Sequence, residues 1–170
     1  MQVNIKDTVR NEFELKLLQY IFDDNSLDFD PKDYNVIKVE NNLNLELDKR
    51  NSIIFLAPIT TSFEFPVLTI YFDRADTDDI IKTINPQLYG FDEKDKLSNV
   101  LHQLNFNILN QVPITLNDFY DNHVAKNDDG SLFIELHAKP SSLFYTGSTA
   151  INITHKKHHS DRLMFDVKTE

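Results

Sequence analysis

Four aspartates lie within seven residues, at Asp73, Asp76, Asp78 and Asp79, and form the densest group of acidic side chains in the sequence. Carboxylate oxygens are ligands of Mg²⁺ and Ca²⁺, so Asp73, Asp76 and Asp79 are candidates for a divalent-metal site. The run lacks the central glycine and the downstream glutamate of an EF-hand loop. Carboxylates at the start of a helix also cap free N–H groups and complement the helix dipole, and we predict this role in preference to metal binding.

A second group with possible chemistry consists of His155, Lys156, Lys157, His158 and His159, the basic cluster of the chain. His155 and His159 could share a metal ion if the segment were helical, because they are four residues apart. The segment directly follows a predicted strand and lacks the carboxylate motif of a zinc-protease helix. We therefore predict a solvated segment or a contact for an acidic neighbour in preference to a metal site.

Local signatures of a catalytic or cofactor site are missing from the sequence. The chain has no cysteine, which excludes disulfides, thiolate catalysis and cysteine-ligated metal centres. Its three glycines, Gly90, Gly130 and Gly147, are too few and too widely spaced for a phosphate-binding loop. A catalytic triad or a carboxylate pair stays open, because such residues meet only in space. We predict no catalytic residue and no cofactor, and expect that the protein is not an enzyme.

The formal charge of −10 argues against a general nucleic-acid binder, because phosphate repels a negative surface. Residues 1–10 lack the apolar region of a signal peptide. The longest apolar runs, such as Ile53 to Pro58, are too short to span a bilayer. We expect synthesis in a cytoplasm and no membrane partner.

The first half of the chain predicts a helix packed on a small mixed sheet. Val9, Phe13, Leu17 and Ile21 recur at helical spacing within residues 5–22. The expected strands are Val36 to Val39, Leu43 to Leu47 with alternating leucines, Ile53 to Leu56 buried on both faces, and Val67 to Phe72. A turn at Asn41–Asn42 separates the first two.

The second half predicts a central helical segment followed by an antiparallel β-hairpin region. The expected helices cover 78–84 and 94–109, with a helical turn at 116–120. Strands at 123–126 and 131–138 flank a two-residue Asp129–Gly130 turn, with Leu132, Ile134 and Leu136 on one face of the second strand. A last strand covers 149–155. The fold class is α+β, with a first lobe at 1–90, a C-terminal module at 91–155 and a polar segment at 156–170.

Residues 96–154 contain a helix (LSNVLHQLN), a PITLNDFYDN step, a strand and the stretch KPSSLFYTGSTAINITHK, which runs on to Lys156. This arrangement resembles the C-terminal module of virion structural proteins from large contractile-tailed bacteriophages. In that resemblance Leu116–Asn117–Asp118 precedes a short strand, and Tyr145–Thr146–Gly147–Ser148 leads into a final alternating strand. Gly147 would supply an unusual backbone conformation or a close approach, with an ordinary turn glycine as the alternative.

The resemblance implies a tail, neck or baseplate subunit that has no active site and resides in the virion after synthesis in the host bacterial cytoplasm. Its partners would be other virion proteins or further copies of itself, and the contact candidates are Tyr145, Gly147 and the basic cluster. Two alternatives stay open. One is an acidic adaptor or inhibitor that binds a basic partner. The other is a metal-dependent enzyme with a site at Asp73, Asp76 and Asp79.

Overall fold

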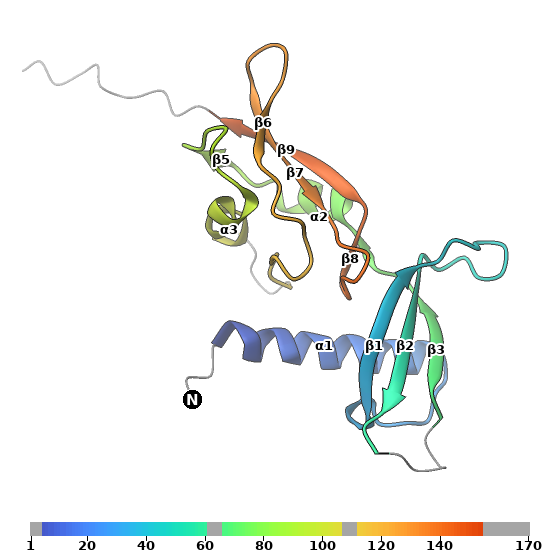
Figure 1. Cartoon of the computed structure of the whole chain (residues 1–170). Helices are drawn as coiled ribbons and strands as arrows, with labels where there is room; N and C mark the ends of the chain where they lie inside the picture. Colours follow the sequence, from blue (N-terminus) through green and yellow to red (C-terminus); the bar gives the residue numbers. More distant parts are fainter. Residues whose placement is uncertain (1–4, 61–65, 107–111, 155–170) are drawn as a thin grey trace, which may run out of the picture.

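The computed structural model describes residues 5–60, 66–106 and 112–154, with side chains from residue 11 onward (Figure 1). Its helices are α1 (Ile5–Asp24), α2 (Thr77–Ile84) and α3 (Leu97–Phe106), with a short 3-10 helix at Pro31–Asp33. Its strands are β1 (Tyr34–Asn41), β2 (Ser52–Pro58), β3 (Leu68–Phe72), β4 (Ala75–Asp76), β5 (Leu88–Tyr89), β6 (Val124–Lys126), β7 (Leu132–His137), β8 (Tyr145–Thr146) and β9 (Ser148–Thr154). The predicted α+β class is confirmed. Across the described ranges, no helix combines the length and the apolar character that crossing a membrane requires.

The first group of elements is α1 with the three-stranded sheet β1-β2-β3. The second half of α1 lies beside the strands (Figure 1), where the Phe22 ring meets the edge of the Tyr34 ring at 5.6 Å. Leu18 and Ile21 are buried with them in the same core. The predicted helix is thereby confirmed, and Phe13, Leu17 and Ile21 of its predicted apolar face pack on the core, whereas the side chain of Val9 lies outside the described ones.

The sheet of this first group differs in one respect from the prediction, since it is antiparallel throughout and not mixed. Its strands are joined by connections too short for a parallel crossover, which normally needs a dozen or more residues. The mixed sheet is the second one, ordered β5-β9-β7-β6, in which β5 runs parallel to β9 and the remaining pairs are antiparallel.

The second group consists of this four-stranded sheet, the parallel pair β4-β8, and helices α2 and α3 (Figure 1). Residues 75–89, which the sequence analysis placed in the first lobe, contribute β4, α2 and β5 to this group. Leu132, Ile134 and Leu136 on β7 are buried, which confirms the predicted inner face of that strand.

Three local expectations are corrected. The hairpin between β6 and β7 has a five-residue loop, 127–131, closed by a 2.9 Å bond from the Asn127 N–H to the Ser131 carbonyl. Strand β2 is fully buried on one face and half-buried on the other. Leu43 to Leu47 forms no strand, since a turn occupies this stretch. Alternating leucines favour a strand only where a neighbouring strand can pair with them.

Candidate functional site

The loop between β1 and β2, residues 42–51, exposes three leucines to solvent, and we call it the leucine loop. Leu43, Leu45 and Leu47 are 94%, 57% and 70% exposed. Isolated exposed leucines are ordinary on protein surfaces, whereas several close together suggest a site of interaction. Three within five residues make this loop the candidate functional site.

The leucine loop is closed at its neck by the buried side chain of Asn42. Its Nδ2 donates to the carbonyl oxygens of Asp48 and Arg50, both at 2.8 Å. Its Oδ1 accepts from the Asn44 N–H at 3.0 Å, and its own N–H donates to the Asn51 carbonyl at 2.8 Å. One amide therefore satisfies backbone groups that a strand partner would otherwise bind, and it fixes the path of the loop.

Arg50 ties the same loop to α1. Its Nε and Nη2 bind the two carboxylate oxygens of Asp48 at 3.0 and 2.7 Å, a bidentate pair. Its Nη1 reaches Asn25 Oδ1 at 2.8 Å and Asp24 Oδ2 at 3.2 Å. The hydrogen bonds from Arg50 lower the pKa of Asp48 to about 2. The leucines are thus presented by a loop whose base is held by charged and amide contacts.

Directly beneath the loop, Arg74 joins the two groups of elements. The side chain is only 4% exposed, although it is cationic. Its Nε donates to Ser52 Oγ at 2.6 Å, its Nη1 to the Pro140 and Ser142 carbonyls at 3.0 and 2.8 Å, and its Nη2 to Asn41 Oδ1. These four acceptors are neutral oxygens, and burial lowers the pKa of Arg74 to about 10. Arg74 therefore bonds the ends of β1 and β2 to the segment before β8.

The acidic run that was a metal candidate is engaged in local hydrogen bonds. Asp73 Oδ1 accepts from the Asn51 N–H at 2.8 Å. Asp76 caps α2 by accepting from the Asp78 N–H at 2.8 Å, which confirms the predicted capping role. Asp79 lies exposed in the first turn of that helix. Among the side chains that the structure describes, no three histidine or acidic residues converge as a metal-binding group.

The other predicted contact residues fall in different places. Tyr145 is buried, with its hydroxyl donating to the Val112 carbonyl at 2.6 Å and its ring 5.2 Å from that of Phe119. Gly147 is exposed at a φ of 78°, and a Cβ there would lie 3.1 Å from Asp76 Oδ2. Both the positive φ and the close approach expected of Gly147 are present. The basic cluster, His155 to His159, lies outside the described residues.

Two of the segments named in the sequence analysis, PITLNDFYDN and the start of KPSSLFYTGSTAINITHK, meet at the buried carboxylate of Asp118. Asp118 Oδ1 accepts from Ser142 Oγ at 2.8 Å, and its Oδ2 accepts from Thr115 Oγ1 at 2.9 Å. The Lys139 N–H also donates to the Asp118 carbonyl. The turn after α3 and the segment before β8 are therefore held together by Asp118, which acts as a structural residue.

Comparison with known families matches one family model to most of the chain. A family model described as "Family of unknown function (DUF7941)" matches residues 10–167. The chain belongs to this family. The matched range includes the leucine loop, Arg74 and both large sheets. No curated protein and no solved structure matches the chain.

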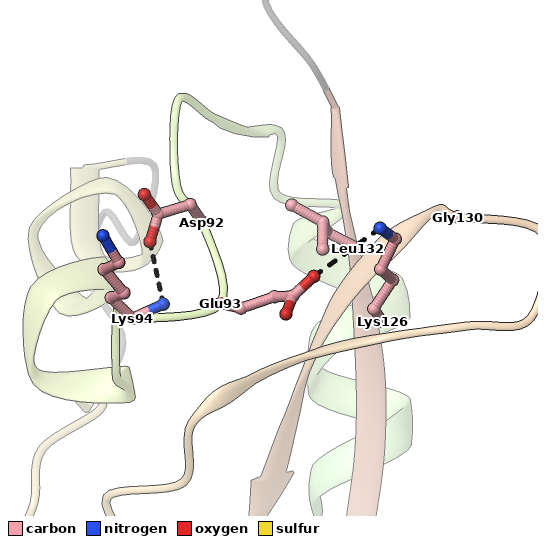
Figure 2. Close-up of a pocket in the computed structure, with 6 residues that line it drawn as sticks. All are labelled: Asp92, Glu93, Lys94, Lys126, Gly130 and Leu132. Atoms are coloured by element: carbon pink, nitrogen blue, oxygen red, sulfur yellow. Dashed lines mark hydrogen bonds and ion pairs between the residues drawn. The ribbon is translucent and has the colours of Figure 1, made fainter.

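Two of the surface hollows among the described residues differ in place: one lies within the second group, and the other lies between the two groups. The larger, of about 340 Å³, is crossed by an ion pair between Glu93 and Lys126 at 3.7 Å, and the Lys94 N–H donates to Asp92 Oδ1 at 2.8 Å beside it (Figure 2). Its two acidic and two basic side chains balance one another. The smaller, of about 180 Å³, borders the Arg74 junction and is lined by Asn41, His137, Ala138, Lys139, Pro140, Thr146, Gly147 and Ser148.

Sequence reasoning missed the residues that build the leucine loop and the junction. Asn42 was assigned to a turn, and Arg74 was passed over as the basic member of an acidic run. The signal for the loop was present in the sequence, because asparagines precede the first two of the alternating leucines, at Asn42 and Asn44, and Asp48 follows the last. Asparagine is depleted in strands and favours turns.

Proposed function

We propose that this chain is a structural subunit that acts through protein–protein contacts, and that its assembly is the contractile-tailed phage virion which the resemblance implies. The observation that supports this most is the leucine loop, in which three leucines face solvent on a backbone held by Asn42 and Arg50. The fold does not use these side chains for its own core.

Burial by a partner would make the loop a source of binding free energy. Covering a fully exposed leucine side chain contributes about 2 kcal/mol. Since the three leucines are 94%, 57% and 70% exposed, covering all of them contributes about 4 kcal/mol before the costs of association. A loop that is already fixed loses less conformational entropy on binding than a flexible one. Both terms favour a docking element over an incidental surface loop.

The test is whether the purified protein joins an assembly. Light scattering across a range of concentration and salt should reveal a discrete oligomer or a concentration-dependent mass, and electron microscopy should show its form. Antibody labelling of virions from a phage that encodes this chain should place it in the tail, neck or baseplate. A protein that stays monomeric and is absent from the particles would overturn the proposal.

A second candidate, the acidic adaptor, is favoured by the formal charge of −10. It requires a basic protein partner and binding that weakens steeply as salt screens the charges. Association that is insensitive to salt would count against it and in favour of docking through the leucines.

A further inference from the structure

We propose that the leucine loop of one molecule receives residues 155–170 of a second molecule, so that copies of the chain associate head to tail. The inference rests on the proposed function, since it names the partner of the same loop. It commits to one occupant, the segment of a neighbouring copy that follows β9.

The loop offers apolar side chains bordered by acidic groups. Glu46 and Asp48 belong to the loop, and Asp24 and Asp73 contact its base through Arg50 and Asn51. Arg50 pairs with Asp48 and Asp24, so the remaining charges are the carboxylates of Glu46 and Asp73 against the one cation Lys49. A partner suited to this surface carries apolar side chains together with cations.

Residues 155–170 combine apolar side chains with four cations, Lys156, Lys157, Arg162 and Lys168, which outnumber the three carboxylates of Asp161, Asp166 and Glu170. The segment opens with the basic cluster, His155 to His159, in a chain whose formal charge is −10. The apolar residues Leu163, Met164 and Phe165 follow, and Val167 lies two positions further on. The cations complement the carboxylates of the loop, and the apolar run complements its leucines. Two independent properties therefore match between the segment and the loop.

The placement of the two partners favours a contact between molecules. In Figure 1 strand β9 ends at the far side of the second group, whereas the leucine loop projects from the first sheet at the opposite side of the molecule. A neighbouring copy can bring its own segment to the loop without any rearrangement of either fold. Such a contact joins two different surfaces, and repeating it produces a ring or a filament.

Complementary variants of the full chain test this arrangement. The loop variant is Leu45→Ser with Leu47→Ser. The segment variant is Lys156→Glu, Lys157→Glu and Phe165→Ser. Each should weaken self-association by about tenfold or more, because each removes one of the two contacting surfaces. Ile37→Thr is the matched control, since it removes an exposed apolar side chain from β1 and should leave the association unchanged.

Mixing the two variants gives the decisive result. The loop variant retains an intact segment and the segment variant retains an intact loop, so an equimolar mixture can form one good junction. Light scattering should then show a one-to-one heterodimer that does not grow further. Circular dichroism and thermal melting of each variant check that both remain folded.

Three other results would overturn the inference. If the loop variant abolishes association and the segment variant does not, the loop contacts a different surface, and the proposed function stands. If the mixture restores nothing although both variants associate poorly, the contact is not head to tail. A wild-type chain that is monomeric at every concentration has no such contact, and labelling of the virion then decides the proposed function separately.

Discussion

The side-chain amide of Asn51 pairs in both directions with the backbone of Arg74. Its Oδ1 accepts from the Arg74 N–H at 2.9 Å, and its Nδ2 donates to the Arg74 carbonyl at 3.0 Å. The amide makes the two hydrogen bonds that the backbone of a neighbouring strand would otherwise make. Arg74 is therefore fixed through its backbone as well as through its guanidinium. Arg74 is thereby held from the side of the leucine loop, because Asn51 is the last residue of that loop.

Replacing Arg74 should destabilise the fold strongly. Arg74→Met leaves the acceptors Ser52, Pro140 and Ser142 without their donor in a buried setting, and we expect a loss of about 3 kcal/mol in the free energy of unfolding. Denaturant unfolding measures the change. Arg50→Met is the control, with a loss of about 1 kcal/mol or less, because its partners remain accessible to water. Equal losses in both variants would contradict the junction role.

Stability should fall in acid partly through Asp48. The pKa of its carboxyl is lowered to about 2 in the folded chain, from an ordinary value of 3.8, by the hydrogen bonds of Arg50. A lowered folded-state pKa gives a contribution that is complete above about pH 4 and is lost as the pH falls toward 2. Denaturant unfolding from pH 6 to pH 2 should show the wild type converging on Asp48→Asn. A constant difference between the two proteins over that range would contradict the assignment.

The amide of Asn105 repeats the Asn51 arrangement. It accepts from the Ile114 N–H and donates to the Ile114 carbonyl, both at 2.8 Å. Asn105→Asp sets a carboxylate against that carbonyl, and we expect a loss of about 1–2 kcal/mol at neutral pH. Asn99→Asp is the matched control in the same helix. Its Oδ1 accepts from the Lys96 N–H, and a carboxylate oxygen can accept the same bond. Denaturant unfolding should therefore show little change in stability.

Alanine substitutions at Gly147 and Gly90 distinguish the cost of backbone strain from the cost of steric crowding. Both have a φ near 80°, but a Cβ at Gly147 would lie 3.1 Å from Asp76 Oδ2, whereas none of the described atoms comes within 4 Å at Gly90. Gly90→Ala should cost about 1 kcal/mol from the left-handed conformation alone. Gly147→Ala should cost more, because the added methyl group displaces the cap of α2. Thermal melting of both variants compares the two losses. Equal decreases in melting temperature would show that the Asp76 side chain moves away from the added methyl group without a cost in stability.

The sequence was sufficient for elements whose pattern and chemistry agree. The apolar spacing of α1, the aspartates before α2 and the alternating face of β7 each predicted what the structure contains. These features depend on neighbours along the chain, so local reasoning could find them.

The leucine loop depends instead on side-chain hydrogen bonds that a strand pattern does not reveal, and Arg74 depends on residues far apart in sequence. Leu43 to Leu47 alternate as a strand would, but Asn42 binds the backbone groups that pairing would need. The buried guanidinium of Arg74 donates to Asn41 and Pro140, which lie 33 and 66 residues away in the chain. That arrangement leaves no local pattern in the sequence, whereas the asparagines beside the leucines were a local signal for the loop.

The amide of Gln103 has a consequence for the outer edge of the second sheet. It bonds both the N–H and the carbonyl of Tyr89, at 3.0 and 3.1 Å, on the side of β5 that faces away from β9. An unoccupied edge can template another strand and begin the stacking that leads to amyloid. At this edge the side chain of Gln103 already occupies the N–H and the carbonyl of Tyr89 with which another strand would pair. Copies of the chain can therefore gather at high local concentration without their sheets fusing along β5.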